Sequence, residues 1–213
     1  SPNTSSIEAR PDLKDSPKLT PESELSIEYK LYLQSDKLIQ AGKFADALEC
    51  LLPLLKAKIN VGQLAMVKNN IGRAYLSTGQ IALGLEYLHF ANRQIPNNPD
   101  ILANLAVAYQ WGQDLKLARQ YAERALKVNP WHNAAQFTRS MVSLLSGDYL
   151  NGFEQYECRW RDRTNELRKP DADKPEWDGS KVGKVYIYGE QGSGDSILML
   201  RYARLIHEMG IKQ

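Results

Sequence analysis

A pattern that returns every 34 residues constrains this 213-residue chain more than any other feature. Tyr75 and Tyr109 lie one such interval apart, and so do Pro96 and Pro130. Small residues, an aromatic residue and a closing proline at fixed places in a period of this length are typical of solenoids built from repeated helix pairs. Solenoids of this kind usually bind a partner along a concave surface rather than catalyse a reaction.

The register predicts four helix pairs, at about residues 28–61, 65–98, 99–132 and 133–162. We expect a glycine to end the first helix of each pair, because the tight turn favours a positive φ. A proline should end the second helix, since it cannot continue the hydrogen-bond ladder. Each pair leaves an apolar face that only the next pair covers, so the array should bury one continuous core.

Two short segments of this register carry a family resemblance. Residues 72–75 read Gly-Arg-Ala-Tyr and residues 106–109 read Ala-Val-Ala-Tyr. Both resemble the first-helix signature of the tetratricopeptide repeat (TPR), and the resemblance covers about residues 26–160. The first repeat lacks the glycine and tyrosine of this signature, and the fourth has Ser140 and Ser143 where other residues are usual. The resemblance implies a mainly α fold class, a right-handed superhelix of helix pairs.

The segments that flank the repeats differ in composition. Residues 1–25 are rich in proline, serine and charged residues, so we expect a flexible N-terminal segment. Residues 161–183 are interpreted as a connector. In residues 184–213, the run Lys-Val-Tyr-Ile-Tyr at 184–188 predicts a strand, a glycine-rich loop follows, and a helix is expected from Asp195 to Met209. This order of elements begins a parallel α/β domain, so the solenoid should be followed by a short βα segment.

The glycine-rich loop does not fit a nucleotide-binding motif. Gly189 and Gly194 have the spacing of a phosphate-binding loop, but Asp195 occupies the position of the lysine and would repel phosphate. Ile197 occupies the place of the third glycine of a dinucleotide fingerprint. We therefore expect no cofactor, and a tight strand-to-helix turn is the simpler interpretation of the loop.

A wider string resembles the junction in bacterial proteins that fuse TPRs to a glycosyltransferase-like (GT-B) domain. Its parts are residues 156–161 (Tyr-Glu-Cys-Arg-Trp-Arg), 175–179 (Pro-Glu-Trp-Asp-Gly) and 189–196 (Gly-Glu-Gln-Gly-Ser-Gly-Asp-Ser). The resemblance implies a domain cut off after its first strand and helix. It makes Asp195 a candidate base in a complete enzyme, whereas the alternative role of Asp195 is a helix N-cap. One strand and one helix cannot form a cleft, so we expect no catalytic activity from this chain.

The TPR resemblance also implies which residues face the concave groove. The candidate ligand-groove residues are Asn69, Asn70, Arg73, Asn104, Val107, Gln110, Trp111, Phe137 and Met141. Asn70 and Asn104 are equivalent residues of adjacent repeats, and an amide can both donate to and accept from a peptide unit. They resemble the asparagine ladder of the repeats attached to protein O-glycosyltransferases. Alternatively, these amides bridge neighbouring helices.

Aromatic residues of the groove have two possible roles as well. Trp111 and Phe137 are candidate anchors for a ligand, because aromatic residues dominate binding hot spots. Packing between adjacent helices is the alternative. A clamp for a peptide carboxylate would need several cations, and Arg73 is the clear candidate that the groove offers.

Composition argues against several other functions. The net charge is +2 with both signs intermixed, so the basic stripe of a nucleic-acid binder is not present. The sequence contains no apolar run of the ~18 residues that suggest a membrane span. Cys50 and Cys158 are far apart, and the histidines lie singly, so we predict free thiols, no metal site and a cytoplasmic location.

Three functions remain open from the sequence. The first is a module that binds a protein or peptide in its concave groove, as the N-terminal part of a glycosyltransferase-like protein. The second is the acceptor-selecting part of an active nucleotide-sugar glycosyltransferase. The third is a self-association scaffold, in which an uncapped repeat or the exposed strand pairs with another copy.

Overall fold

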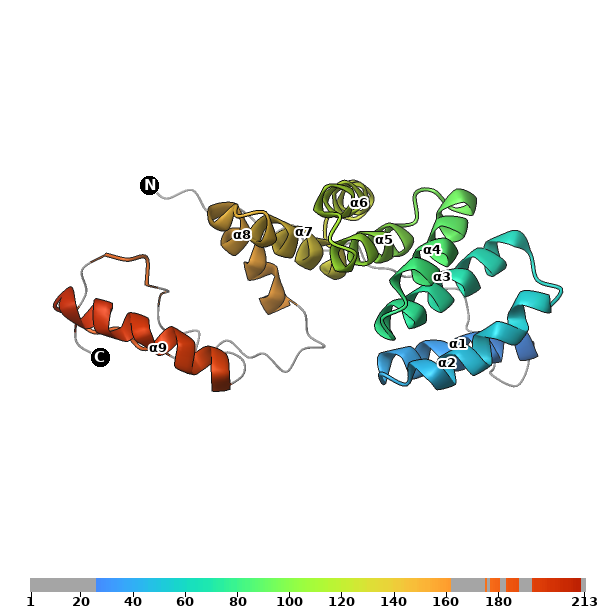
Figure 1. Cartoon of the computed structure of the whole chain (residues 1–213), viewed down its shortest axis with the longest axis horizontal. Coiled ribbons are helices and arrows are strands. Elements are labelled where there is room, and N and C mark those ends of the chain that lie inside the picture. The colour runs from blue at the N-terminus through green and yellow to red at the C-terminus, as the bar shows by residue number, and fades with distance from the viewer. Residues whose placement is uncertain (1–25, 162–174, 176, 181–182, 188–192, 212–213) are drawn as a thin grey trace, which may run out of the picture.

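The computed structural model describes residues 26–161, 175, 177–180, 183–187 and 193–211 (Figure 1). The first two pairs comprise α1 (Ile27–Gln40), α2 (Phe44–Leu51) with the 3₁₀ helix η2 (Leu52–Lys56), α3 (Val61–Ser77) and α4 (Ile81–Gln94). The next two pairs comprise α5 (Pro99–Trp111), α6 (Leu115–Val128), α7 (Asn133–Leu145) and α8 (Tyr149–Tyr156) with the 3₁₀ helix η3 (Glu157–Arg161). Helix α9 (Ser193–Glu208) follows. The second helix of each of the first three pairs packs on the first helix of the next pair, which confirms a helical-repeat array.

Local sequence sets where the first helices begin. Asn60 forms a capping box with Gln63, in which its Oδ1 accepts the Gln63 N–H at 2.8 Å and the Gln63 Oε1 accepts the Asn60 N–H at 3.0 Å. Asn98 caps α5 by accepting the Ile101 N–H at 3.0 Å, and Pro99 is the first helical residue. These side chains satisfy backbone donors that have no partner within the helix. The starts of α3 and α5 are therefore determined by the local sequence.

The turns inside the pairs follow the sequence prediction with one correction. Gly42, Gly79 and Gly147 have φ values of 72°, 80° and 81°, as a glycine that ends a first helix requires. In the third pair Gly112 has a φ of −75°, and Gln113 adopts the left-handed conformation at 64° instead. The expectation of a positive φ at glycine in every pair was thus wrong for this turn, where the bend comes one residue later.

The core lies between the helices of a pair and continues into the next pair. Leu76, Leu88, Ile101 and Leu105 belong to one buried cluster that joins α3, α4 and α5. Gly72 lets α3 and α4 approach, because a Cβ built there would lie 2.7 Å from Leu88 Cγ and 3.0 Å from the carbonyl oxygen of Gly84. The small residues of the repeat signature therefore mark helix crossings, as expected.

The predicted strand at 184–188 does not form in the described residues. Lys184 makes a single isolated bridge, residues 185–187 have no regular secondary structure, and Tyr188 lies outside the described part. A strand needs partner strands to satisfy its backbone groups, and the described segments supply no second strand. The predicted helix is present as α9, and it begins two residues earlier than Asp195.

Several sequence-based predictions concern residues that the structure does not describe. They are the N-terminal segment 1–25, most of the connector 161–183, and residues 189–192 of the glycine-rich loop. The side chain of Asp195 also lies outside the described part, so its role remains a prediction. Among the helices that are described, none has both the length and the apolar character needed to cross a membrane.

Candidate ligand-binding groove

The first helices of the four pairs, α1, α3, α5 and α7, each contact the next and so form one continuous surface of the array. These helices carry the residues that the sequence predicts for a groove. Small residues at the crossings bring α4 and α6 close behind α3 and α5, so the surface is backed by a packed layer. Side chains on this surface are therefore presented from a rigid support.

A hollow of about 250 Å³ opens at the C-terminal ends of α1, α3 and α5, and we call it the tryptophan hollow. It is lined by Ile39, Phe44, Arg73, Leu76, Ser77, Asn104, Val107 and Trp111. Four predicted groove residues therefore meet here, although they come from two repeats. Trp111 is 48% exposed, which leaves a large part of its indole ring free for contact.

A second hollow of about 350 Å³ opens at the N-terminal ends of α1 and α3, and we call it the tyrosine pocket. Its apolar wall includes Tyr29, Tyr32, Leu54, Ile59, Met66 and Ile95. Tyr29 and Tyr32 stack with their ring centroids 6.4 Å apart. None of these residues is among the nine predicted groove residues. Ile59 lies between η2 and α3, close to residues 62–64, which separate the first two predicted repeats. This interruption of the 34-residue register was the available signal.

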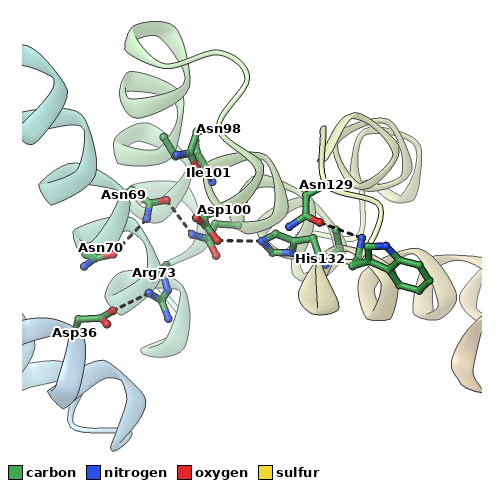
Figure 2. A network of polar contacts seen from close by, with 12 residues as sticks. Asp36, Asn69, Asn70, Arg73, Asn98, Asp100, Ile101, Asn129 and His132 are labelled. Atoms are coloured by element: carbon green, nitrogen blue, oxygen red, sulfur yellow. Dashed lines mark hydrogen bonds and ion pairs between the residues drawn. The ribbon is translucent and has the colours of Figure 1, made fainter. Parts of the chain in front are cut away.

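Polar side chains form a row on this surface between the two hollows and beyond them (Figure 2). Arg73 pairs with Asp36 of α1, with 3.4 Å between Arg73 Nη1 and Asp36 Oδ1. Both side chains are about one-third exposed, at 33% and 37%. Opposite charges at this distance near the surface attract only modestly, so the pair positions the guanidinium more than it stabilises the fold.

The asparagines are linked differently from the predicted ladder. Asn104 Nδ2 donates to Asn69 Oδ1 at 2.8 Å, and Asn69 Nδ2 donates to Asn70 Oδ1 at 3.3 Å (Figure 2). Asn104 therefore reaches the residue before its equivalent in the preceding repeat. Asn69 and Asn70 are both 2% exposed. This arrangement bridges neighbouring helices, and it uses both the oxygen and the nitrogen of the Asn69 side-chain amide.

Two side-chain amides of this row, those of Asn70 and Asn104, keep unused hydrogen-bonding capacity in the described structure. Asn70 Nδ2 is buried and has no hydrogen-bond partner among the described residues. An unpaired buried donor costs about 1–3 kcal/mol. Asn104 lines the tryptophan hollow, and within the described part no hydrogen bond is made by its Oδ1. Asn104 can therefore accept an N–H from a molecule in that hollow.

The other three predicted residues lie outside both hollows. Gln110 is half-buried near the end of α5. Phe137 is 41% exposed, and its ring lies 5.6 Å from that of Tyr156, so it packs on the end of α8. Met141 is half-buried on α7. The structure thus gathers Arg73, Asn104, Val107 and Trp111, while these three stand apart from them.

His132 connects the third and fourth pairs. Its Nε2 lies 3.0 Å from Asp100 Oδ1, and its Nδ1 accepts the Ala135 N–H at 3.3 Å at the start of α7 (Figure 2). A neutral ring with its proton on Nε2 satisfies both contacts. The hydrogen bond from His132 is the main reason that the pKa of Asp100 lies below its ordinary value.

This contact predicts a pH effect on stability. The pKa of Asp100 is lower in the folded than in the unfolded chain, so its contribution is present above about pH 4 and is lost as the pH falls further. Urea unfolding measured from pH 6 to pH 3 (roughly the range that spans this titration) should show a small loss of stability that Asp100→Asn reduces. The effect is small because the Asp100 side chain is 65% exposed. An identical pH dependence in Asp100→Asn would contradict this assignment.

Other reactive groups do not cluster in the described part of the chain. No set of three or more His, Cys, Asp or Glu side chains there could hold a metal ion. Cys50 and Cys158 are free thiols, and burial is the main cause that raises the pKa of each. The described groove thus offers apolar surface, amides and one ion pair, which suits binding.

Comparison with solved structures identifies the fold. MamA (41-end) from Desulfovibrio magneticus RS-1 aligns with a TM-score of 0.52 and 18% identity, over 65% of this chain and 77% of that chain. The first TPR of Spaghetti (RPAP3) bound to the HSP90 peptide SRMEEVD gives 0.51 and 18%, over 56% and 95%. The first TPR domain of human RPAP3 gives 0.51 and 18%, over 59% and 96%. No model of a protein family matches the sequence, and no curated protein matches it significantly. These likenesses show that the repeats have the TPR fold.

Proposed function

We propose that this chain is a TPR module that binds an extended peptide or protein segment in its concave groove. The observation that carries the proposal is the tryptophan hollow, where Arg73, Asn104, Val107 and Trp111 meet on the surface of the first helices. The free Oδ1 of Asn104 supplies an acceptor for a peptide N–H, and Trp111 supplies apolar contact. The RPAP3 structure, a TPR with a bound peptide, supports a peptide as the kind of ligand.

Trp111→Ala is the variant that tests this proposal. The immobilised chain should enrich particular sequences from a phage library of random peptides. Synthetic peptides with these sequences should bind Trp111→Ala about 30-fold more weakly than they bind the wild type. Trp131→Ala is the matched control, because Trp131 is 69% exposed and does not line the hollow. Fluorescence anisotropy of labelled peptides measures the affinities, and thermal melting confirms that both variants fold. Equal affinity for Trp111→Ala and the wild type would reject the groove as the binding site.

We also propose that the repeats are the N-terminal part of a cytoplasmic glycosyltransferase-like protein, in which they would select the acceptor. The junction-like string at 156–161, 175–179 and 189–196 supports this. The proposed domain boundaries are those of the sequence: 1–25, 26–160, 161–183 and 184–213. Sequencing the gene on the 3′ side of the codon for Gln213 tests it, because a second nucleotide-binding lobe must be encoded there. An immediate stop codon would contradict it.

Self-association is a second candidate that one observation favours. Tyr149, Leu150 and Phe153 of α8 are 63%, 85% and 60% exposed. In the three preceding pairs the second helix is covered by the next first helix, whereas α8 contacts α7 and η3 in the described part. An apolar face of this kind is a common site of association. Light scattering over a range of concentrations tests it, and a strict monomer would exclude it.

A further inference from the structure

The tyrosine pocket is an unassigned apolar site at one end of the groove. Its volume of about 350 Å³ falls within the range of pockets that bind ligands or buried side chains. Tyr29 and Tyr32 form a stacked aromatic wall, and Leu54, Ile59 and Met66 add apolar surface alongside polar and small lining residues. Tyr29 remains 45% exposed, so the wall is open to contact. A large apolar side chain is the occupant that matches this lining.

The pocket and the tryptophan hollow lie along the same two helices. Met66 and Arg73 are both on α3, and Met66 lines the pocket while Arg73 lines the hollow. At 1.5 Å per residue their separation along the axis is roughly 10 Å. An extended peptide covers this distance with roughly three residues. One ligand segment can therefore reach both sites at once.

The charged side chains beside the two sites restrict which peptide segments can bind there. The charged residues that line the two sites are Glu28 in the pocket and Arg73 in the hollow. Arg73 already pairs with Asp36, which lies on α1 between Tyr32 and Ile39. The surface that spans the two sites therefore carries two carboxylates, those of Glu28 and Asp36, and one guanidinium, that of Arg73. An acidic ligand would meet net repulsion, whereas a neutral or basic one would not.

We infer that the groove selects an extended segment with two large apolar side chains about three or more residues apart and no acidic residue between them. The first apolar side chain enters the tyrosine pocket, and the second lies against Trp111. This selectivity rests on the proposed peptide-binding function and specifies the class of peptide that the groove would bind. On this charge pattern we do not expect the groove to act as a clamp for an acidic peptide end.

Filling the tyrosine pocket tests the inference. Gly62 lies in the pocket wall on α3, and a Cβ built there meets only Asn60 Oδ1, at 3.3 Å, within 4 Å. Gly62→Leu adds a side chain at the pocket, and leucine favours a helix more than glycine does. Peptides selected on phage by the wild type should carry the apolar pair. Selection on Gly62→Leu should lose the preference at the first position and keep it at the second.

Two further variants distinguish failure of the two-site inference from failure of the proposed peptide binding. Tyr29→Ala should weaken the selected peptides about tenfold, and Tyr149→Ala, a tyrosine exposed on α8, should not. If peptides bind through Trp111 but are acidic, or if Gly62→Leu selects the same sequences as the wild type, the two-site inference is wrong and peptide binding stands. If no enrichment depends on Trp111, the groove is not the peptide-binding site and the proposed function is wrong. Gly62→Ala, which adds one methyl group, controls for loss of the glycine.

Discussion

Truncating Leu88 to alanine is expected to lower the free energy of unfolding by about 2–5 kcal/mol, the range for removing a buried leucine. Leu88 is fully buried, and its side chain lies at the crossing of α3 and α4. It belongs to the cluster that continues into α5, so its loss weakens both a pair and the contact between pairs. Denaturant unfolding followed by circular dichroism measures the effect.

The control for Leu88 is the same substitution at an exposed site. Leu150 on α8 is 85% exposed, so Leu150→Ala should change stability by no more than about 0.5 kcal/mol. A loss below about 1 kcal/mol for Leu88→Ala would mean that the crossing collapses around the missing side chain, or that the two pairs do not share a core. Repeat arrays can lose cooperativity, so the slope of the unfolding curve is compared as well.

Adding one methyl group at Gly72 is expected to cost about 1–3 kcal/mol. The new Cβ would lie 2.7 Å from Leu88 Cγ and 3.0 Å from the backbone oxygen of Gly84, and the backbone contact cannot be relieved by a rotamer change. Helices α3 and α4 must therefore move apart. Gly62→Ala in the same helix meets one side-chain atom, the capping oxygen of Asn60 at 3.3 Å, and no backbone atom, so it should change stability by no more than about 0.5 kcal/mol.

The double variant Gly72→Ala with Leu88→Ala shows which contact causes the loss. Truncating Leu88 removes the Cγ and Cδ2 atoms that the new methyl group meets, and leaves the contact with Gly84. The combined cost should therefore be smaller than the sum of the two single costs. An additive result would assign the whole effect of Gly72→Ala to the backbone contact. Arg73 follows Gly72 in α3, so peptide affinity of the folded single variant should fall too.

The sequence predicted the parts of the fold that each repeat determines by itself. The glycine and alanine positions around Tyr75 and Tyr109 indicated helix crossings, because close approach requires small residues at those points. The strand at 184–188 was predicted from β-branched and aromatic residues alone, and such a preference does not form a strand without hydrogen-bonded neighbours. The turn at Gln113 shows that a glycine at the repeated position does not determine which residue adopts the left-handed conformation.

The candidate site was predicted only where equivalent positions of the repeats are also neighbours in space. Trp111 and Arg73 line the same hollow, as the register suggested. The asparagine chain runs through Asn69, because contacts between adjacent repeats join residues that are not equivalent in the register. The tyrosine pocket depends on Leu54 and Ile59, which lie outside the regular first helices. Spacing alone does not reveal contacts of that kind.

The contacts of the polar row that join neighbouring first helices differ in kind. Between α3 and α5 a short amide contact of 2.8 Å joins the buried Asn69 to the partly buried Asn104. Between α1 and α3 the corresponding tie is the partly exposed pair of Asp36 and Arg73 at 3.4 Å. We expect the second of these contacts to open more readily than the first, because it is partly exposed to water. A segment bound against both α1 and α3 should hold these two helices together. Ligand binding should therefore reduce bending of the array at its N-terminal end.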